Sequence, residues 1–257
     1  MKIGFFDSGI GGLTVLGHAL KILPFADYIY YADIKHVPYG EKTKGEVRQY
    51  VQTAMDYMAE IKVDAVVIAC NTATSVADAK LRRNYSFPII GMEPAVKPAV
   101  AYCQEIGKKI LVLATSLTLR EEKFQQLIHR LDATAMVDTL ALGGLVKFAE
   151  QFEFDTLEVN QYLQKEFASL KLSDYGAVVL GCTHFPLYSK LLQQYFTTET
   201  IFFDGSVGAM NHLADILEQK GVAPSLDDKL KFVITNGKLP PSDVDYKKIL
   251  QAYVHSI

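Results

Sequence analysis

The sequence predicts an α/β protein of two similar lobes, each with a mainly parallel sheet, and a ligand cleft between the lobes. Two observations carry this prediction. Short apolar runs alternate with helical patterns along most of the chain, which is typical of parallel strands covered by helices. Two of these runs also end in a cysteine, as Ala65-Val-Val-Ile-Ala-Cys70 and Ala177-Val-Val-Leu-Gly-Cys182, 112 positions apart. Two parts of the chain are therefore expected to share the same order of strands and helices.

The predicted strands are short, apolar and rich in β-branched residues, as buried parallel strands are. They are residues 3–6, 28–31, 65–69, 89–91, 110–114, 177–181 and 201–203. A leucine stripe from Leu13 to Leu23 has the helical period of 3.6 residues. Further helices are predicted at 44–61, 185–195 and 211–220, and turns at 224–228 and 239–241.

The repeat divides the chain into lobes. Residues 1–94 with 206–257 are expected to form the first lobe, which carries Cys70, and residues 95–205 the second, which carries Cys182. Chain ends commonly lie close together, so a return of the last segment to the first lobe is reasonable. A ligand is expected between the lobes.

Composition narrows the class of protein. The chain has 257 residues, of which 49% are hydrophobic, and a net charge of −3, which gives no electrostatic case for nucleic acid or an anionic membrane. No apolar run is long enough for a membrane span, and the cytoplasm is the expected location. Three cysteines make no disulfide framework. Cys182 and His184 alone do not predict a metal site.

A glycine-rich loop, Asp7-Ser8-Gly9-Ile10-Gly11-Gly12, joins the first strand to the first helix. Glycines there allow backbone N–H groups to approach an anion at the start of a helix. The pattern is neither a dinucleotide fingerprint nor a phosphate-binding P-loop. A carboxylate ligand fits it better than a nucleotide.

The two cysteines follow strand ends, which is where open α/β sheets place their ligands. Thr183 is predicted to cap the helix that follows Cys182, and a helix start of this kind lowers the pKa of a thiol. His184 can relay protons to Cys182. Cys70-Asn71-Thr72 repeats the arrangement, so a lowered thiol pKa is expected there too, with Asp7 available on the adjacent strand. Two matched thiols indicate two acid/base groups.

Two other residues are ambiguous on their own. Tyr39-Gly40, in Val37-Pro38-Tyr39-Gly40, indicates either a turn or a rim that contacts a substrate through its backbone. Glu150 indicates either a solvated helix carboxylate or the counterpart of Tyr39 in the second lobe, 111 positions along the chain.

Taken together, four motifs in order resemble those of the glutamate racemases: Asp7-Ser8-Gly-Ile-Gly-Gly, Pro38-Tyr39-Gly40, Ala69-Cys70-Asn71-Thr72, and Gly181-Cys182-Thr183-His184-Phe185-Pro186. The resemblance runs from residue 4 to about residue 190. It implies the aspartate/glutamate racemase fold, no cofactor, and a supply of D-glutamate for bacterial peptidoglycan. A homodimer is the expected assembly.

The resemblance also implies roles for single residues. Cys70 and Cys182 become the two catalytic bases. Apart from the resemblance, Asp7 and His184 are the candidates to assist Cys70 and Cys182 respectively, and Glu150 is a candidate to support the Cys182 site. The implied substrate contacts are Asp7, Ser8, Tyr39, Gly40, Asn71, Thr72, Thr115, Thr118, Thr183 and His184.

Three alternatives stay open on the sequence. The first is an aspartate racemase, since one methylene in a pocket discriminates by only ~1–3 kcal/mol. The second is a thiol oxidoreductase, in which Cys70 and Cys182 would form a reversible disulfide. The third is a binding protein whose lobes close on an amino acid without chemistry.

Overall fold

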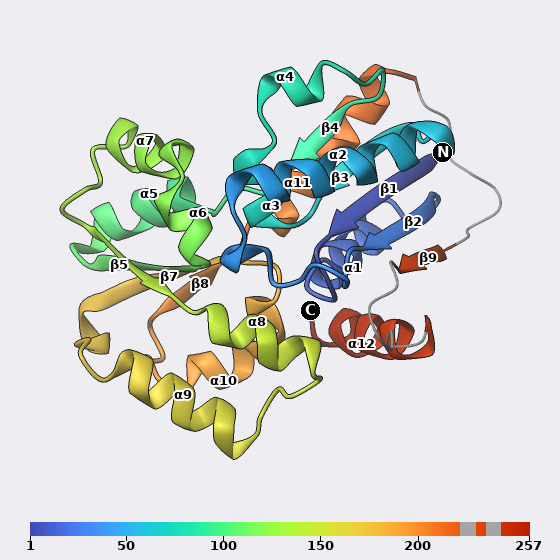
Figure 1. The fold of residues 1–257 in the computed structure, drawn as a ribbon. Coiled ribbons are helices and arrows are strands. Elements are labelled where there is room, and N and C mark those ends of the chain that lie inside the picture. Colours follow the sequence, from blue (N-terminus) through green and yellow to red (C-terminus); the bar gives the residue numbers. More distant parts are fainter. Residues whose placement is uncertain (222–229, 235–242) are drawn as a thin grey trace.

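The computed structural model describes residues 1–221, 230–234 and 243–257 and contains two parallel sheets (Figure 1). In the first sheet the strand order is β4-β3-β1-β2-β9. Its strands are β1 (Lys2–Asp7), β2 (Asp27–Ala32), β3 (Ala65–Ile68), β4 (Ile89–Gly91) and β9 (Leu230–Ile234). In the second sheet the order is β6-β5-β7-β8. Its strands are β5 (Lys109–Ala114), β6 (Val137–Ala141), β7 (Tyr175–Gly181) and β8 (Ile201–Phe203).

The two sheets share one topology, which confirms the predicted repeat. The order β4-β3-β1-β2 in the first matches β8-β7-β5-β6 in the second, so that β3 and β7, the strands before the two cysteines, are equivalent. All seven predicted strands are present. The edge strands β6 and β9 were not predicted. β6 is not fully buried and reads Val-Asp-Thr-Leu-Ala, so it lacks the continuous apolar run of a central strand.

The helices of the first sheet lie on both of its faces (Figure 1). α1 packs against α11 and α12, which brings the end of the chain back to the first sheet. On the other face α2 begins with a capping box, in which Thr43 and Glu46 each bond the other's backbone N–H. The elements are α1 (Leu13–Ile22), η1 (Tyr39–Glu41), α2 (Lys44–Glu60), α3 (Asn71–Val76), α4 (Ala79–Arg82), α11 (Ser206–Gln219) and α12 (Asp243–Ser256).

The second sheet carries the remaining helices. They are α5 (Val96–Ile106), α6 (Ser116–Arg120), α7 (Glu122–Arg130), α8 (Gly143–Glu150), α9 (Leu157–Phe167), η2 (Leu172–Asp174), η3 (Phe185–Tyr188) and α10 (Ser189–Gln193). The prediction of one continuous helix at 185–195 is wrong. A 3₁₀ turn comes first, in which the Leu187 N–H donates to the carbonyl of His184, three residues back.

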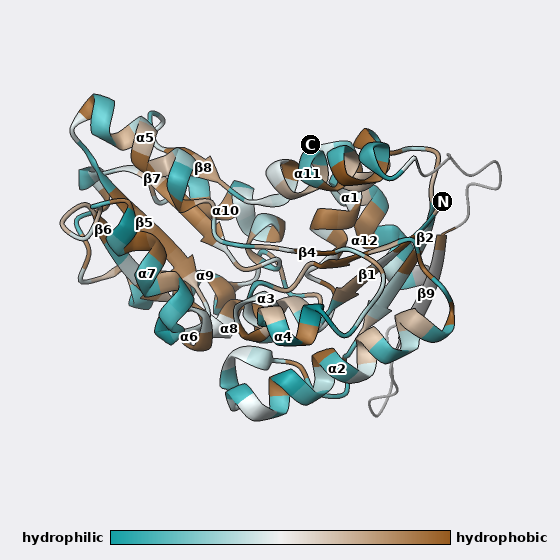
Figure 2. Cartoon of the chain, turned by 90° about the horizontal axis from the view of Figure 1, so that it is seen from above, coloured by the Kyte–Doolittle hydropathy of each residue, from teal (hydrophilic) through white to brown (hydrophobic). Residues whose placement is uncertain are grey.

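The hydrophobic core spans both lobes. One continuous cluster joins Phe5 and Leu16 of the first lobe to Leu180 and Phe185 of the second. Figure 2 shows brown, hydrophobic strands inside and teal residues on the outer helix faces. We propose residues 1–94 with 206–257 and residues 95–205 as the two lobes, a division supported by sheet membership. The predicted turns at 224–228 and 239–241 lie outside the described residues. Among the described residues, no helix has the length and apolar composition to cross a membrane.

Candidate active site

Equivalent strands bring the predicted site residues to one place between the sheets. Asp7 ends β1, Thr115 follows β5, Cys182 follows β7, and Cys70 comes two residues after β3. Hydrogen bonds then cross from lobe to lobe. The Thr183 hydroxyl donates to Asp7 Oδ2 at 3.1 Å, and the hydroxyls of Thr72 and Thr115 are 2.8 Å apart. The carboxyl ends of the two sheets therefore face each other.

The Cys70 thiol lies at the start of α3, in a buried position. Its Sγ accepts from the Ala73 N–H at 3.4 Å and lies 3.8 Å from the Ser8 hydroxyl. Burial raises the pKa of Cys70 well above its ordinary value, and the charge of Asp7 raises it further. The expectation of a lowered thiol pKa is wrong at this position. The helix N–H does lower the pKa, but burial outweighs it.

The Cys182 thiol is the end of a short polar chain within the second lobe. Its Sγ lies 3.6 Å from His184 Nδ1, and His184 Nε2 lies 2.6 Å from Glu150 Oε1. Burial opposes a charge on His184, but the bonds to Cys182 and Glu150 outweigh it and raise the pKa of the imidazole well above its usual range. Thr183 does not cap a helix, since its hydroxyl bonds Asp7 instead. A proton can pass between this imidazole and the thiol.

The glycine-rich loop fits against these side chains with almost no space to spare. A Cβ on Gly9 would lie 1.9 Å from Glu150 Oε1, and one on Gly11 would lie 2.5 Å from His184 Nδ1. The Gly9 N–H donates to Asp7 Oδ1 at 3.0 Å, and the Ile10 N–H donates to Glu150 Oε1 at 2.8 Å. These two amides thus bind the protein's own carboxylates, and they orient the acid/base groups rather than receive a ligand.

Tyr39 and Gly40 lie in η1 and reach the second lobe. The Tyr39 hydroxyl donates to Asp33 Oδ2 at 2.6 Å, so its polar end is engaged within the first lobe. A Cβ on Gly40 would lie 2.7 Å from Thr115 Cβ. Contact of the Tyr39-Gly40 backbone with a substrate stays a prediction. Sequence reasoning missed Asp33, although it follows β2 as Ser8 follows β1.

A cluster of three threonines closes the other side of the site. Thr72 comes from the first lobe, and Thr115 and Thr118 from the second. Their hydroxyl oxygens are 2.8 to 3.2 Å apart, and all three are buried. Next to them, Asn71 Nδ2 donates to the Met92 carbonyl. Thr115 Oγ1 also accepts the Thr118 N–H at 3.3 Å. A hydroxyl hydrogen can rotate, so these side chains can donate to an incoming carboxylate.

Known proteins share this chain's sequence and fold. The model of the Asp/Glu/Hydantoin racemase family matches residues 20–209. The chain belongs to this family. Glutamate racemase 2 of Bacillus subtilis is 47% identical over 98% of this chain and 96% of the relative. The glutamate racemase of Halothermothrix orenii is 50% identical over 86% of this chain and 87% of the relative.

A solved structure gives the same result for the fold of this racemase family member. Escherichia coli glutamate racemase, in complex with L-glutamate and the activator UDP-MurNAc-Ala, is 29% identical. The match covers 98% of this chain and 94% of that one, with a TM-score of 0.85.

The racemase site is closed in this structure. Cys70 is 5% exposed and Cys182 6%. Among the described residues three ion pairs link the lobes, and one of them joins Glu93 to Lys123. Glu41, at the end of η1, pairs with Lys147 of α8 at 2.7 Å. Lys44, at the start of α2, pairs with Glu121 at 2.6 Å. A ligand can therefore reach the thiols only when the lobes separate.

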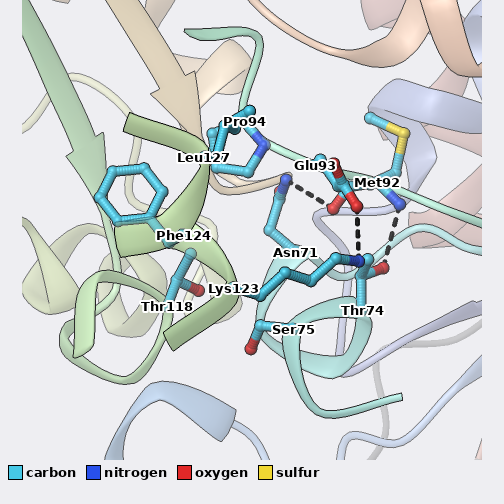
Figure 3. Close-up of a pocket in the computed structure, with 10 residues that line it drawn as sticks. All are labelled: Asn71, Thr74, Ser75, Met92, Glu93, Pro94, Thr118, Lys123, Phe124 and Leu127. Carbon is cyan, nitrogen blue, oxygen red and sulfur yellow. Dashed lines mark hydrogen bonds and ion pairs between the residues drawn. The ribbon is translucent and has the colours of Figure 1, made fainter. Parts of the chain in front are cut away.

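Figure 3 shows a crevice that backs onto Asn71 and Thr118 and is bordered by the Glu93–Lys123 ion pair. Its volume is about 20 Å³, enough for roughly one water molecule. A wider hollow, between β4 and α11, is lined by Arg82, Asp204 and His212 among others. Neither cysteine lines either hollow. Neither hollow therefore reaches the two thiols.

Asp7 gives this site a testable pH dependence. Burial raises its pKa from 3.8 to about 6, although His184 and the Gly9 N–H oppose the shift. Because the folded-state pKa is raised, the folded protein favours the protonated carboxyl. The resulting stabilisation is complete below pH 4 and is lost as the pH rises through 6.

The substitution Asp7→Asn is therefore expected to raise the free energy of unfolding at pH 7.5 by up to about 3 kcal/mol. At pH 4.5 most of this gain should disappear. Urea unfolding of both proteins at the two pH values measures the difference. An equal difference at both values would contradict the assignment.

Proposed function

We propose that the protein interconverts L- and D-glutamate without a cofactor, by proton transfer between two thiols. The observation that carries the proposal is that each lobe supplies one cysteine, Cys70 and Cys182, from equivalent strand ends. Inversion at an α-carbon requires a proton to leave one face and another to arrive at the opposite face. Two bases on facing lobes can do this without moving the substrate.

The surroundings of the thiols suggest the starting roles. With L-glutamate, the Cys182 thiolate removes the α-proton while the Cys70 thiol donates a proton to the other face. The raised pKa of Cys70 keeps that thiol protonated, as an acid must be. His184, held by Glu150, accepts and returns the proton of Cys182. With D-glutamate the two thiols exchange roles, and Asp7 lies beside Cys70 to assist it.

Substrate binding is assigned to the polar groups around the thiols. Preorganised donors stabilise the charge that develops on the α-carboxylate. The proposed contacts are Asp7, Ser8, Tyr39, Gly40, Asn71, Thr72, Thr115, Thr118, Thr183 and His184, and all of them except Gly40 are buried. We further propose a cytoplasmic homodimer that supplies D-glutamate for peptidoglycan. The relatives' name, glutamate racemase, supports the D-glutamate product alone.

The alternatives receive less support. The relatives reported above are named glutamate racemases, not aspartate racemases. The three cysteines, Cys70, Cys103 and Cys182, are free in the structure, which does not favour a thiol oxidoreductase. The arrangement of acid/base partners on both thiols goes beyond what a binding protein needs.

The test is α-proton exchange and loss of optical rotation with L-glutamate in deuterated buffer, without added pyridoxal phosphate. L-aspartate is run alongside. Rotation that decays to zero with deuterium uptake, for glutamate alone, is the expected result. Faster exchange with L-aspartate would make aspartate the substrate in place of glutamate. No exchange with either amino acid would overturn the proposal.

A further inference from the structure

A single peptide group of the glycine-rich loop is bonded on both sides. Its carbonyl, that of Gly9, accepts the hydroxyl of Tyr30 at 2.7 Å. Its N–H, that of Ile10, donates to Glu150 Oε1 at 2.8 Å. Since both bonds are made by one planar amide, the Tyr30 hydroxyl fixes the plane from which Glu150 receives its bond. A bonded carbonyl also makes the N–H of the same amide a stronger donor.

The chain of bonds continues to the reacting sulfur. The same oxygen of Glu150 lies 2.6 Å from His184 Nε2, and His184 Nδ1 lies 3.6 Å from Cys182 Sγ. Tyr30 belongs to the first lobe and Cys182 to the second. The hydrogen-bond chain of Tyr30, the Gly9–Ile10 peptide, Glu150, His184 and Cys182 therefore crosses between the lobes.

Tyr30 is held rigidly for this task. It is fully buried in β2, and its ring meets the edge of the Tyr246 ring in α12 with centroids 6.0 Å apart. A Cβ on Gly12 would lie 2.7 Å from its hydroxyl, so the loop closes around it. Burial, and next the charge of Asp7, raise the pKa of Tyr30 well above its ordinary value, which keeps the phenol protonated as a donor.

We propose that Tyr30 is a positioning residue for the Cys182 side of the reaction, acting through the Gly9–Ile10 peptide on Glu150 and His184. The inference rests on the proposed two-thiol racemisation. It assigns to the first lobe a part in orienting the acid/base partner of the second lobe's thiol. It also gives the closed arrangement of the lobes a chemical role, because Glu150 is fully bonded only when they meet.

The test compares Tyr30→Phe with Tyr28→Phe. Tyr28 is a matched control: it lies on the same strand and the same face, it is buried, and its hydroxyl bonds the carbonyls of Ala19 and Leu23, away from the site. Each change removes one buried hydroxyl and keeps the ring. Wild-type racemisation is measured first, so that a failure of the proposed function is seen separately.

Tyr30→Phe is expected to lower kcat about tenfold, the effect of one buried hydrogen bond, with KM little changed. Tyr28→Phe should keep the wild-type kcat at a comparable loss of unfolding midpoint. L- and D-glutamate have equal free energies, so the variant cannot favour one direction in kcat/KM. Isotope effects are therefore needed to show whether proton transfer is slowed at Cys182 or at Cys70.

Substrates with deuterium at the α-carbon show which of the two thiols has the slowed proton transfer. If proton removal by Cys182 is slowed, the isotope effect on kcat/KM should rise with deuterated L-glutamate and fall with deuterated D-glutamate. In the Glu150→Gln background, Tyr30→Phe should have little further effect, because both act through one chain. The inference is overturned if Tyr30→Phe keeps the wild-type kcat or changes the isotope effects of both enantiomers equally. It is also overturned if the effects of Tyr30→Phe and Glu150→Gln on kcat are additive. A wild type that racemises neither amino acid overturns it together with the proposed function.

Discussion

Replacing either Cys70 or Cys182 with serine is expected to lower kcat for glutamate racemisation by about 10³-fold, within the range for loss of a general acid or base. A hydroxyl is a much weaker acid than a thiol, so it neither gives up nor recovers the proton at a useful rate. The change is nearly isosteric, and the buried surroundings of both sulfurs should be kept. The decay of optical rotation with each enantiomer measures the loss.

Cys103→Ser is the matched control. Cys103 is buried in α5, and its Sγ lies 3.6 Å from the Lys109 carbonyl, outside the site. This variant should racemise as the wild type does. Full activity in Cys70→Ser or in Cys182→Ser would rule out the two-thiol mechanism, whatever the activity of Cys103→Ser.

Gly9→Ala is expected to cost about 10²-fold in kcat, comparable with losing a positioned acid/base group. The added Cβ would lie 1.9 Å from Glu150 Oε1 and 2.4 Å from its Cδ, closer than atoms can approach. The carboxylate must therefore move, and it loses its bonds to the Ile10 N–H and to His184. Steady-state kinetics with both enantiomers measure the effect.

The same substitution at Gly143 provides the comparison. Gly143 begins α8, the helix that carries Glu150, and a Cβ there meets nothing within 4 Å. Gly143→Ala should keep the wild-type kcat, and alanine suits a helix better than glycine. Unchanged kinetics for Gly9→Ala would show that racemisation does not depend on where Glu150 lies.

The repeat made most of the fold predictable, because buried parallel strands leave a clear apolar pattern. β6 escaped because it is an edge strand that carries Asp138 and Thr139. Applying the repeat to β2 would have found it, since β2 pairs with β1 as β6 pairs with β5. The internal repeat therefore predicts a strand, β6, that the hydrophobic pattern alone does not predict.

The candidate site was predictable where polar residues follow apolar strands, and less so elsewhere. Glu150 had only its offset from Tyr39 to suggest a role, because its partner Ile10 lies 140 positions away. Tyr30 was hidden inside an apolar strand, where a tyrosine looks like core: its ring packs while its hydroxyl bonds. The pKa of Cys70 was mispredicted because a helix start is visible in a sequence and the depth of burial is not.

The ion pairs between the lobes do not share one polarity. Glu41 and Glu93 of the first lobe meet Lys147 and Lys123 of the second, whereas Lys44 of the first lobe meets Glu121 of the second. These six side chains together present no net charge and neither attract nor repel a distant anion. The ion pairs hold the two lobes together only at short range. Ionic strength should consequently alter how quickly the lobes part, and with it the release of product, more than the rate at which glutamate arrives.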